Sequence, residues 1–82
     1  MRVTARFFAV LRERMGHAAM QVQMPPGETV AALWEKIVAE RPELRELRAA
    51  TRVAVNGRYA TPETPLHDGD EVAFLPPMSG GA

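Results

Sequence analysis

The sequence predicts an α+β fold in which a sheet of four to five strands packs on one main helix. Three observations lead to this prediction. Short segments that alternate apolar and polar residues, typical of strands with one buried face, occur near both ends and in the middle of the chain. One longer segment has the apolar spacing of an amphipathic helix. A length of 82 residues provides for one core and therefore one domain.

Two strands, at residues 2–7 and 20–24, are predicted near the N-terminus, and each alternates apolar with polar residues. Between them, residues 8–15 place apolar side chains three or four positions apart, which predicts a short helix. Gly16 can supply the left-handed residue that ends this helix. The prolines and glycine of residues 25–27 end the second strand, because proline has no N–H to donate. We expect the second strand to run antiparallel to the first.

The main helix is predicted to begin after Thr29, a good N-cap residue, and to end near Arg41 because Pro42 follows. A further short helical turn is expected at residues 43–49. We interpret the apolar face of the main helix, including its tryptophan, as core packing and not as a cofactor site. This face consists of Val30, Leu33, Trp34, Ile37 and Val38.

Three more strands are predicted in the C-terminal half of the chain. Residues 53–55 lead into Asn56-Gly57, a strong hairpin signal because both residue types tolerate positive φ, and a short strand around Tyr59 follows. Asp68-Gly69-Asp70 forms a turn, after which residues 71–75 alternate again. This last strand leads directly into the closing segment PPMSGGA.

The composition excludes several classes of function. Ten basic and ten acidic residues cancel, so charge alone recruits neither nucleic acid nor an anionic membrane, and we expect neither as a partner. Nine of the basic residues are arginines, and Lys36 is the sole lysine, which makes the chain a poor acceptor of lysine-linked modification. Without a signal peptide or a segment long enough to span a bilayer, a cytoplasmic protein is expected.

Residues that commonly carry catalysis or bind metals are scarce. The chain has no cysteine, so any sulfur chemistry must use sulfur that the sequence does not encode. His17 and His67 are isolated, and Ser79 has no histidine at a suggestive spacing. The acidic residues 68–71 lack the ligand run of a calcium loop and are better explained by turn formation. We therefore predict no metal site.

The C-terminal segment is the remaining candidate for function. Gly80 and Gly81 lose backbone entropy when they become ordered, and they bury no side chain in return. Small residues also accumulate at frayed termini, so the two glycines alone are weak evidence for a function. Because the pair follows a predicted strand and two stiffening prolines, we interpret the segment as a strip of backbone that enters a narrow channel of a partner.

Three blocks, RVTARFFAVLRE, VAVNG and PLHDGDEVAFLPPMSGG, resemble the small subunits of molybdopterin synthase, which are ubiquitin-like sulfur carriers with a β-grasp fold. The resemblance covers nearly the whole chain. It implies a mixed sheet on one main helix, with short additional helices, in a domain of residues 1–76 followed by a flexible tail of residues 77–82. The sulfur carriers of the thiamine pathway share the fold and the Gly-Gly end but match the third block less well.

The resemblance also implies a mechanism and partners. An activating enzyme uses ATP to convert the terminal glycine carboxylate into a transient acyl adenylate, and sulfur from a separate donor protein then replaces AMP to give a thiocarboxylate. The tail enters the large subunit of the synthase and transfers the sulfur to precursor Z, the pterin precursor. The chain is then a subunit without a catalytic site of its own, and it binds no cofactor permanently.

Residue roles follow from the same resemblance. Gly81 matches the sulfur-bearing glycine and Gly80 the glycine before it. Phe8 and Leu75 are out of phase with the buried residues of their strands, which independently suggests exposed apolar groups at an interface; the alternative is that they fill a small cluster under the loops. The residues expected to contact partners are Phe8, Arg12, Tyr59, Leu75, Pro76, Pro77, Met78, Ser79 and Gly80.

Ala82 departs from the family pattern, which ends at the second glycine. It moves the reacting carboxylate by one residue, or about 3.3 to 3.6 Å, whereas a displacement of about 1 Å can reduce a rate by about a hundredfold. We expect a peptidase to remove Ala82, although adapted partner pockets are an alternative. Three other functions stay open: sulfur carriage for thiamine or cysteine synthesis, protein modification through Gly81, and a plain interaction module.

Overall fold

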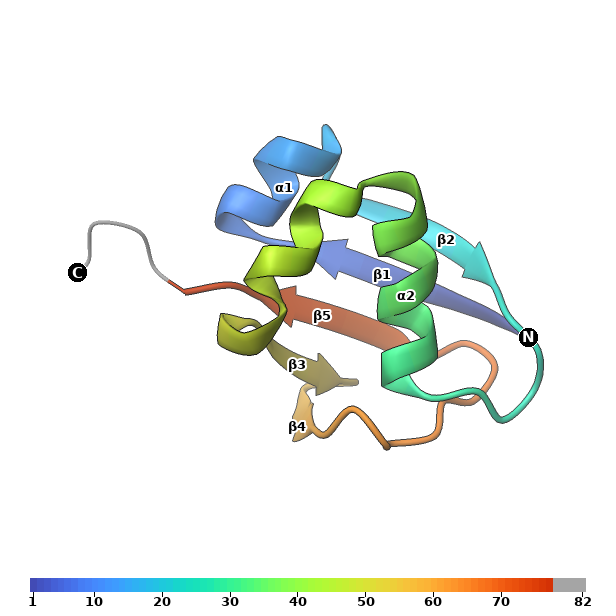
Figure 1. The fold of residues 1–82 in the computed structure, drawn as a ribbon. Helices are drawn as coiled ribbons and strands as arrows, with labels where there is room; N and C mark the ends of the chain where they lie inside the picture. The colour runs from blue at the N-terminus through green and yellow to red at the C-terminus, as the bar shows by residue number, and fades with distance from the viewer. Residues whose placement is uncertain (78–82) are drawn as a thin grey trace.

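The computed structural model describes residues 1–77, and Figure 1 shows how its strands and helices are arranged. The order of elements confirms the α+β prediction. The elements are β1 (Arg2–Phe7), α1 (Ala9–Met15), β2 (Ala19–Gln23), α2 (Val30–Glu40), the 3₁₀ helix η1 (Pro42–Ala50), β3 (Arg52–Val55), β4 (Arg58–Ala60) and β5 (Glu71–Leu75).

The five strands form one mixed sheet in the order β2-β1-β5-β3-β4. β1 pairs antiparallel with β2 and parallel with β5, while β3 pairs antiparallel with both β4 and β5. The last strand therefore occupies the centre of the sheet. The predicted antiparallel pairing of the first two strands is confirmed, as is the hairpin at Asn56-Gly57, where φ is 51° and 84°.

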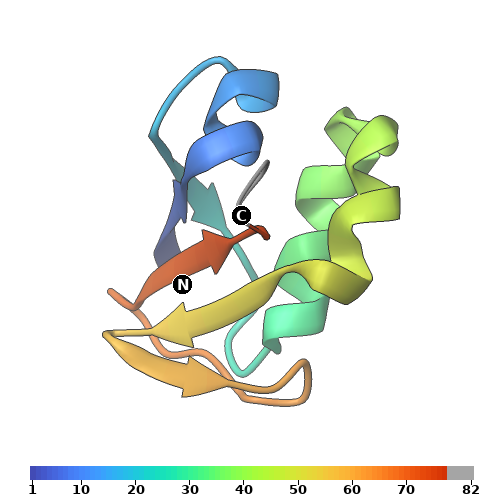
Figure 2. The same cartoon turned by 90° about the vertical axis from the view of Figure 1, so that its left-hand side faces the viewer.

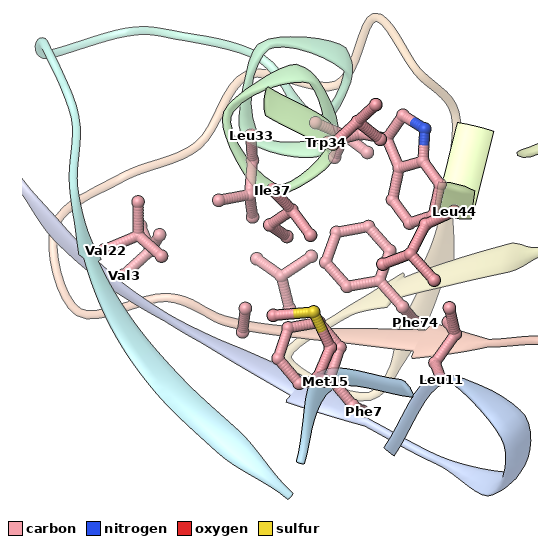
Figure 3. Close-up of a cluster of buried hydrophobic side chains, with 14 of the residues drawn as sticks. Val3, Phe7, Leu11, Met15, Val22, Leu33, Trp34, Ile37, Leu44 and Phe74 are labelled. Atoms are coloured by element: carbon pink, nitrogen blue, oxygen red, sulfur yellow. The ribbon is translucent and has the colours of Figure 1, made fainter. Parts of the chain in front are cut away.

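The helices cover one face of the sheet and enclose the core. α2 and η1 lie against this face (Figure 2), and α1 adds Leu11 and Met15 to the same core. The Phe74 ring lies 6.1 Å from the Phe7 ring and 5.3 Å from Trp34 between ring centroids, at the middle of the buried cluster (Figure 3). This is the β-grasp arrangement, and the interpretation of the Trp34 face as core is confirmed.

Some element boundaries differ from the predictions. Phe8 has extended backbone and caps α1 without joining it, and β2 ends at Gln23, although Met24 stays buried and its N–H donates to the Met1 carbonyl. η1 is a nine-residue 3₁₀ helix and not a single turn. Its Leu44 is buried in the core, which holds η1 in place, and Arg45 forms an exposed ion pair of 3.3 Å with Glu35 of α2.

Polar contacts of Asp70 hold together the loop before β5. The Asn56 side-chain amide donates to one Asp70 carboxylate oxygen at 2.9 Å, and the backbone N–H of His67 donates to the other at 2.8 Å. Asp68 accepts from the backbone N–H of Arg2 at 2.8 Å. These bonds confirm that the acidic residues serve the turn and the start of β5.

Replacing Asp70 by Ala is expected to lower the free energy of unfolding by about 1 to 2 kcal/mol, because two donors lose their partner. The measurement is urea denaturation of the two proteins. Glu63→Ala is the control, since Glu63 is exposed and its side chain makes no hydrogen bond within residues 1–77. Equal stability of Asp70→Ala and wild type would show that the contacts contribute little.

Candidate functional site

The candidate site lies where β5 leaves the sheet. β5 is paired on both sides, with β1 and with β3, and ends at Leu75. Pro76 and Pro77 follow without joining the sheet, and they are the last residues that the structure describes. A central strand is held by two ladders of backbone hydrogen bonds, so it presents the following segment from a firmly fixed point.

A groove of about 370 Å³, which we call the exit groove, surrounds this point. Its walls come from three parts of the chain: the start of α1, the junction of η1 with β3, and the end of β5. The lining residues are Phe8, Ala9, Ala50, Arg52, Leu75, Pro76 and Pro77.

Phe8 places an exposed aromatic ring in the wall of the exit groove. The residue is 40% exposed, and its carbonyl accepts from the N–H of Leu11 at 3.1 Å in the first turn of α1. The next residue, Ala9, has φ of 51°, a left-handed conformation that an alanine adopts at an energetic cost. Strained backbone of this kind is concentrated at functional sites, and here it turns the chain sharply between β1 and α1.

Arg52 connects Tyr59 to the exit groove. Leu75 of β5 lies opposite Arg52 of β3, and the Arg52 guanidinium lies 5.8 Å from the centroid of the Tyr59 ring. Tyr59 is 72% exposed, whereas Leu75 is half-buried. A cation over an aromatic face is attractive, so Arg52 stabilises the position of Tyr59 beside the groove.

The structure thus brings together four of the predicted contact residues, Phe8, Leu75, Pro76 and Pro77, in one groove. Tyr59 adjoins them through Arg52, while Arg12 is exposed on α1 and does not line the groove. Sequence reasoning missed Ala9, Ala50 and Arg52. Only the register between β3 and β5 places Arg52 beside Leu75, and no local sequence pattern predicts that pairing.

The predicted roles of Met78, Ser79, Gly80, Gly81 and Ala82 fall on residues outside the described range, and they stay predictions. Across residues 1–77, no group of three or more His, Cys, Asp and Glu side chains is placed to hold a metal ion. In the same range, no helix is long and apolar enough to cross a bilayer. The described lining of the exit groove consists of apolar residues and Arg52, which makes it a surface for contacts.

Comparisons with known proteins agree with this architecture. The model of the ThiS family matches residues 5–81. The molybdopterin synthase sulfur carrier subunit of Escherichia coli (strain K12) is 40% identical over 77 residues, which cover 92% of this chain and 94% of that protein.

Two solved structures are similar over almost the full chain. SAMP1 from Haloferax volcanii has a TM-score of 0.86 at 29% identity, with 99% of this chain and 100% of that chain covered. A chain in the complex of subunits 1 and 2 of the molybdopterin-converting factor from Helicobacter pylori 26695 has a TM-score of 0.68 at 28% identity, with 99% and 100% covered. The chain described here belongs to the ThiS family and is related along nearly its whole length to molybdopterin synthase sulfur carrier subunits.

Proposed function

We propose that this chain is the sulfur carrier subunit of a molybdopterin synthase and that Gly81 bears the sulfur. The observation that carries the proposal is the match to the ThiS family, which extends from the β-grasp domain through Gly81. Relatives with the name sulfur carrier subunit share 30% to 40% of their residues with it. The absence of cysteine requires a carrier group other than a thiol, and a terminal carboxylate meets that need.

The chemistry begins at the carboxylate of Gly81. An activating enzyme joins this carboxylate to the α-phosphate of ATP, pyrophosphate leaves, and a transient acyl adenylate forms. A donor protein releases sulfur at the oxidation level of sulfide, which attacks the carbonyl carbon; the bond to the phosphate oxygen breaks, and AMP departs. The resulting thiocarboxylate is anionic and nucleophilic, so it can pass its sulfur to the pterin precursor in the active site of the large subunit.

The described residues suit the delivery of such a tail. β5 holds the chain in the sheet as far as Leu75, and Phe8 offers apolar surface for a partner beside the two prolines that follow. The Helicobacter pylori complex, which pairs the two subunits of a molybdopterin-converting factor, supports a second subunit as that partner. The activating enzyme would use the same exit, because both enzymes need the same terminal group.

Ala82 has to be removed before Gly81 can be activated. The family match ends at Gly81, and the residue that follows would displace the reacting carboxylate by about 3.3 to 3.6 Å. A peptidase of the host is the simplest agent, since loss of one terminal residue requires no change in the partner enzymes.

Intact-mass measurement tests the proposal. A chain that ends at Gly81, incubated with the activating enzyme, ATP and a sulfur source, is expected to gain the mass that corresponds to replacement of one oxygen atom by sulfur. The chain that ends at Ala82 is expected to stay unmodified. Sulfur on the Ala82 chain would overturn the trimming step alone, whereas the absence of sulfur on both chains would overturn the proposed function.

Protein modification is the second candidate, and the similarity to SAMP1, small archaeal modifier protein 1 of Haloferax volcanii, favours it. Evidence for this function would be native conjugates in which Gly81 is joined to lysines of other proteins. Mass spectrometry of tryptic peptides from the source cell would detect them. Carriage of sulfur to thiamine or cysteine synthesis is tested by reconstitution, because only a molybdopterin pathway carrier supplies the second subunit with sulfur.

A further inference from the structure

A second cavity, of about 450 Å³, lies between the helices and the β3–β4 hairpin, and we call it the side cavity. In Figure 2, α2 and η1 stand beside this hairpin. The walls are mainly apolar, from Val30, Ala31, Trp34, Val53, Ala60, Pro62 and Phe74, and the polar contributions come from Arg48, Thr51, Arg52 and Tyr59. The volume is sufficient for a large side chain and falls in the range of known binding sites.

Trp34 gives the side cavity a rigid aromatic wall. It is 2% exposed and packs against Phe74, with 5.3 Å between the ring centroids. Its Nε1 is buried and has no hydrogen-bond partner within residues 1–77. A buried donor without an acceptor costs free energy, and here that cost falls on a residue in the cavity wall.

Two arginines make the side cavity cationic. Neither Arg48 nor Arg52 forms an ion pair among residues 1–77, and no acidic residue lines the cavity. Apolar walls beside two guanidinium groups that form no ion pair among residues 1–77 complement an apolar group that is followed by a carboxylate. This is a combination that a protein segment with Phe, Leu or Ile next to Asp or Glu provides.

The side cavity adjoins the exit groove, and Arg52 lines both. β4 ends at Ala60, opposite Val53, so Arg52 at the start of β3 has no partner in β4. A partner that covers the exit groove therefore comes within reach of the side cavity at Arg52. This adjacency favours a segment of that partner as the occupant over an independent small molecule.

We propose that the side cavity is a docking site for the second subunit of the synthase, which inserts an apolar side chain there and places a neighbouring carboxylate against Arg48 and Arg52. The inference rests on the proposed function, because it takes the receiver of the tail as the partner. It adds a point of attachment outside the exit groove. The domain is then held at two places, which fixes its orientation while the tail reaches the active site.

Two variants test the side cavity without changing the exit groove. Ala31→Leu fills the cavity from α2, with a residue of high helix propensity, and Arg48→Glu reverses one of its charges. Each is expected to weaken binding to the second subunit by about tenfold, as measured by titration calorimetry. The control is Arg41→Glu, which makes the same change of net charge at the exposed C-cap of α2, about 15 Å along the helix from Ala31.

The outcomes separate this inference from the proposed function. Weakening by both variants, with Arg41→Glu near wild type and all proteins folded by urea denaturation, supports the docking site. Wild-type affinity in either variant overturns it and leaves the proposed function intact. If the chain alone forms a dimer that Ala31→Leu disrupts, the occupant is a second copy and the inference is wrong. If wild type does not bind the second subunit, both are wrong, and sulfur loading of Gly81 still reports on the carrier chemistry.

Discussion

A chain that ends at Gly80 is expected to fold as stably as the chain that ends at Gly81, and to deliver no sulfur to the pterin precursor. Shortening the tail by one residue withdraws the terminal carbonyl by about 3.3 to 3.6 Å. A misplacement of about 1 Å can already cost about a hundredfold in rate. The measurement is pterin conversion in a reconstituted synthase, together with the intact mass of the carrier.

Stability serves as the internal control for this truncation. The buried core residues lie between Val3 and Phe74, well before the residue that is removed. The urea midpoint of the two chains is therefore expected to agree. Sulfur delivery by the chain that ends at Gly80, at a rate near that of the Gly81 chain, would contradict the assignment of Gly81 as the sulfur-bearing residue.

Much of the fold could be predicted from local sequence patterns. The alternation in β1 and β5 and the apolar face of α2 each reflect a single burial periodicity, and Asn56-Gly57 fixes a turn by its own backbone preferences. The extended backbone of Phe8 and the length of η1 were not foreseen. The length of η1 depends on packing against distant segments, since Leu44 is buried in the core.

The surfaces around the tail could be predicted only in part. The phase of β1 correctly indicated that Phe8 is exposed, because Phe7 takes the buried position beside it. Arg52 escaped notice because its significance comes from pairing with Leu75, 23 positions later in the chain. Trp34 was correctly predicted to be buried, yet it also lines a cavity together with residues of η1, β3 and β4, which the sequence did not indicate. The helical spacing of apolar residues predicts which side chains are buried, but it does not predict the cavities between helices and strands.

The neighbouring residues Phe7 and Phe8 give the second large prediction. Phe7→Ala is expected to lower the free energy of unfolding by about 3 to 5 kcal/mol, because Phe7 is 1% exposed and lies against Phe74. At the usual stability per residue, a domain of 82 residues has a free energy of unfolding of about 4 to 12 kcal/mol. The substitution thus removes a large share of the free energy of unfolding. Urea denaturation followed through the fluorescence of Trp34, the sole tryptophan, measures the loss.

Phe8→Ala is the matched variant, since it removes the same atoms from the opposite side of the strand end. Its ring is 40% exposed, so the free energy of unfolding is expected to change by less than about 1 kcal/mol. Binding to the second subunit is expected to weaken by about tenfold, because the exit groove loses its aromatic wall. Unchanged affinity in Phe8→Ala would remove the exit groove from the interface, and unchanged stability in Phe7→Ala would contradict the packing around Phe74. Loss of stability in Phe7→Ala and loss of affinity in Phe8→Ala would show that one phenylalanine belongs to the core and its neighbour to the surface that binds the partner.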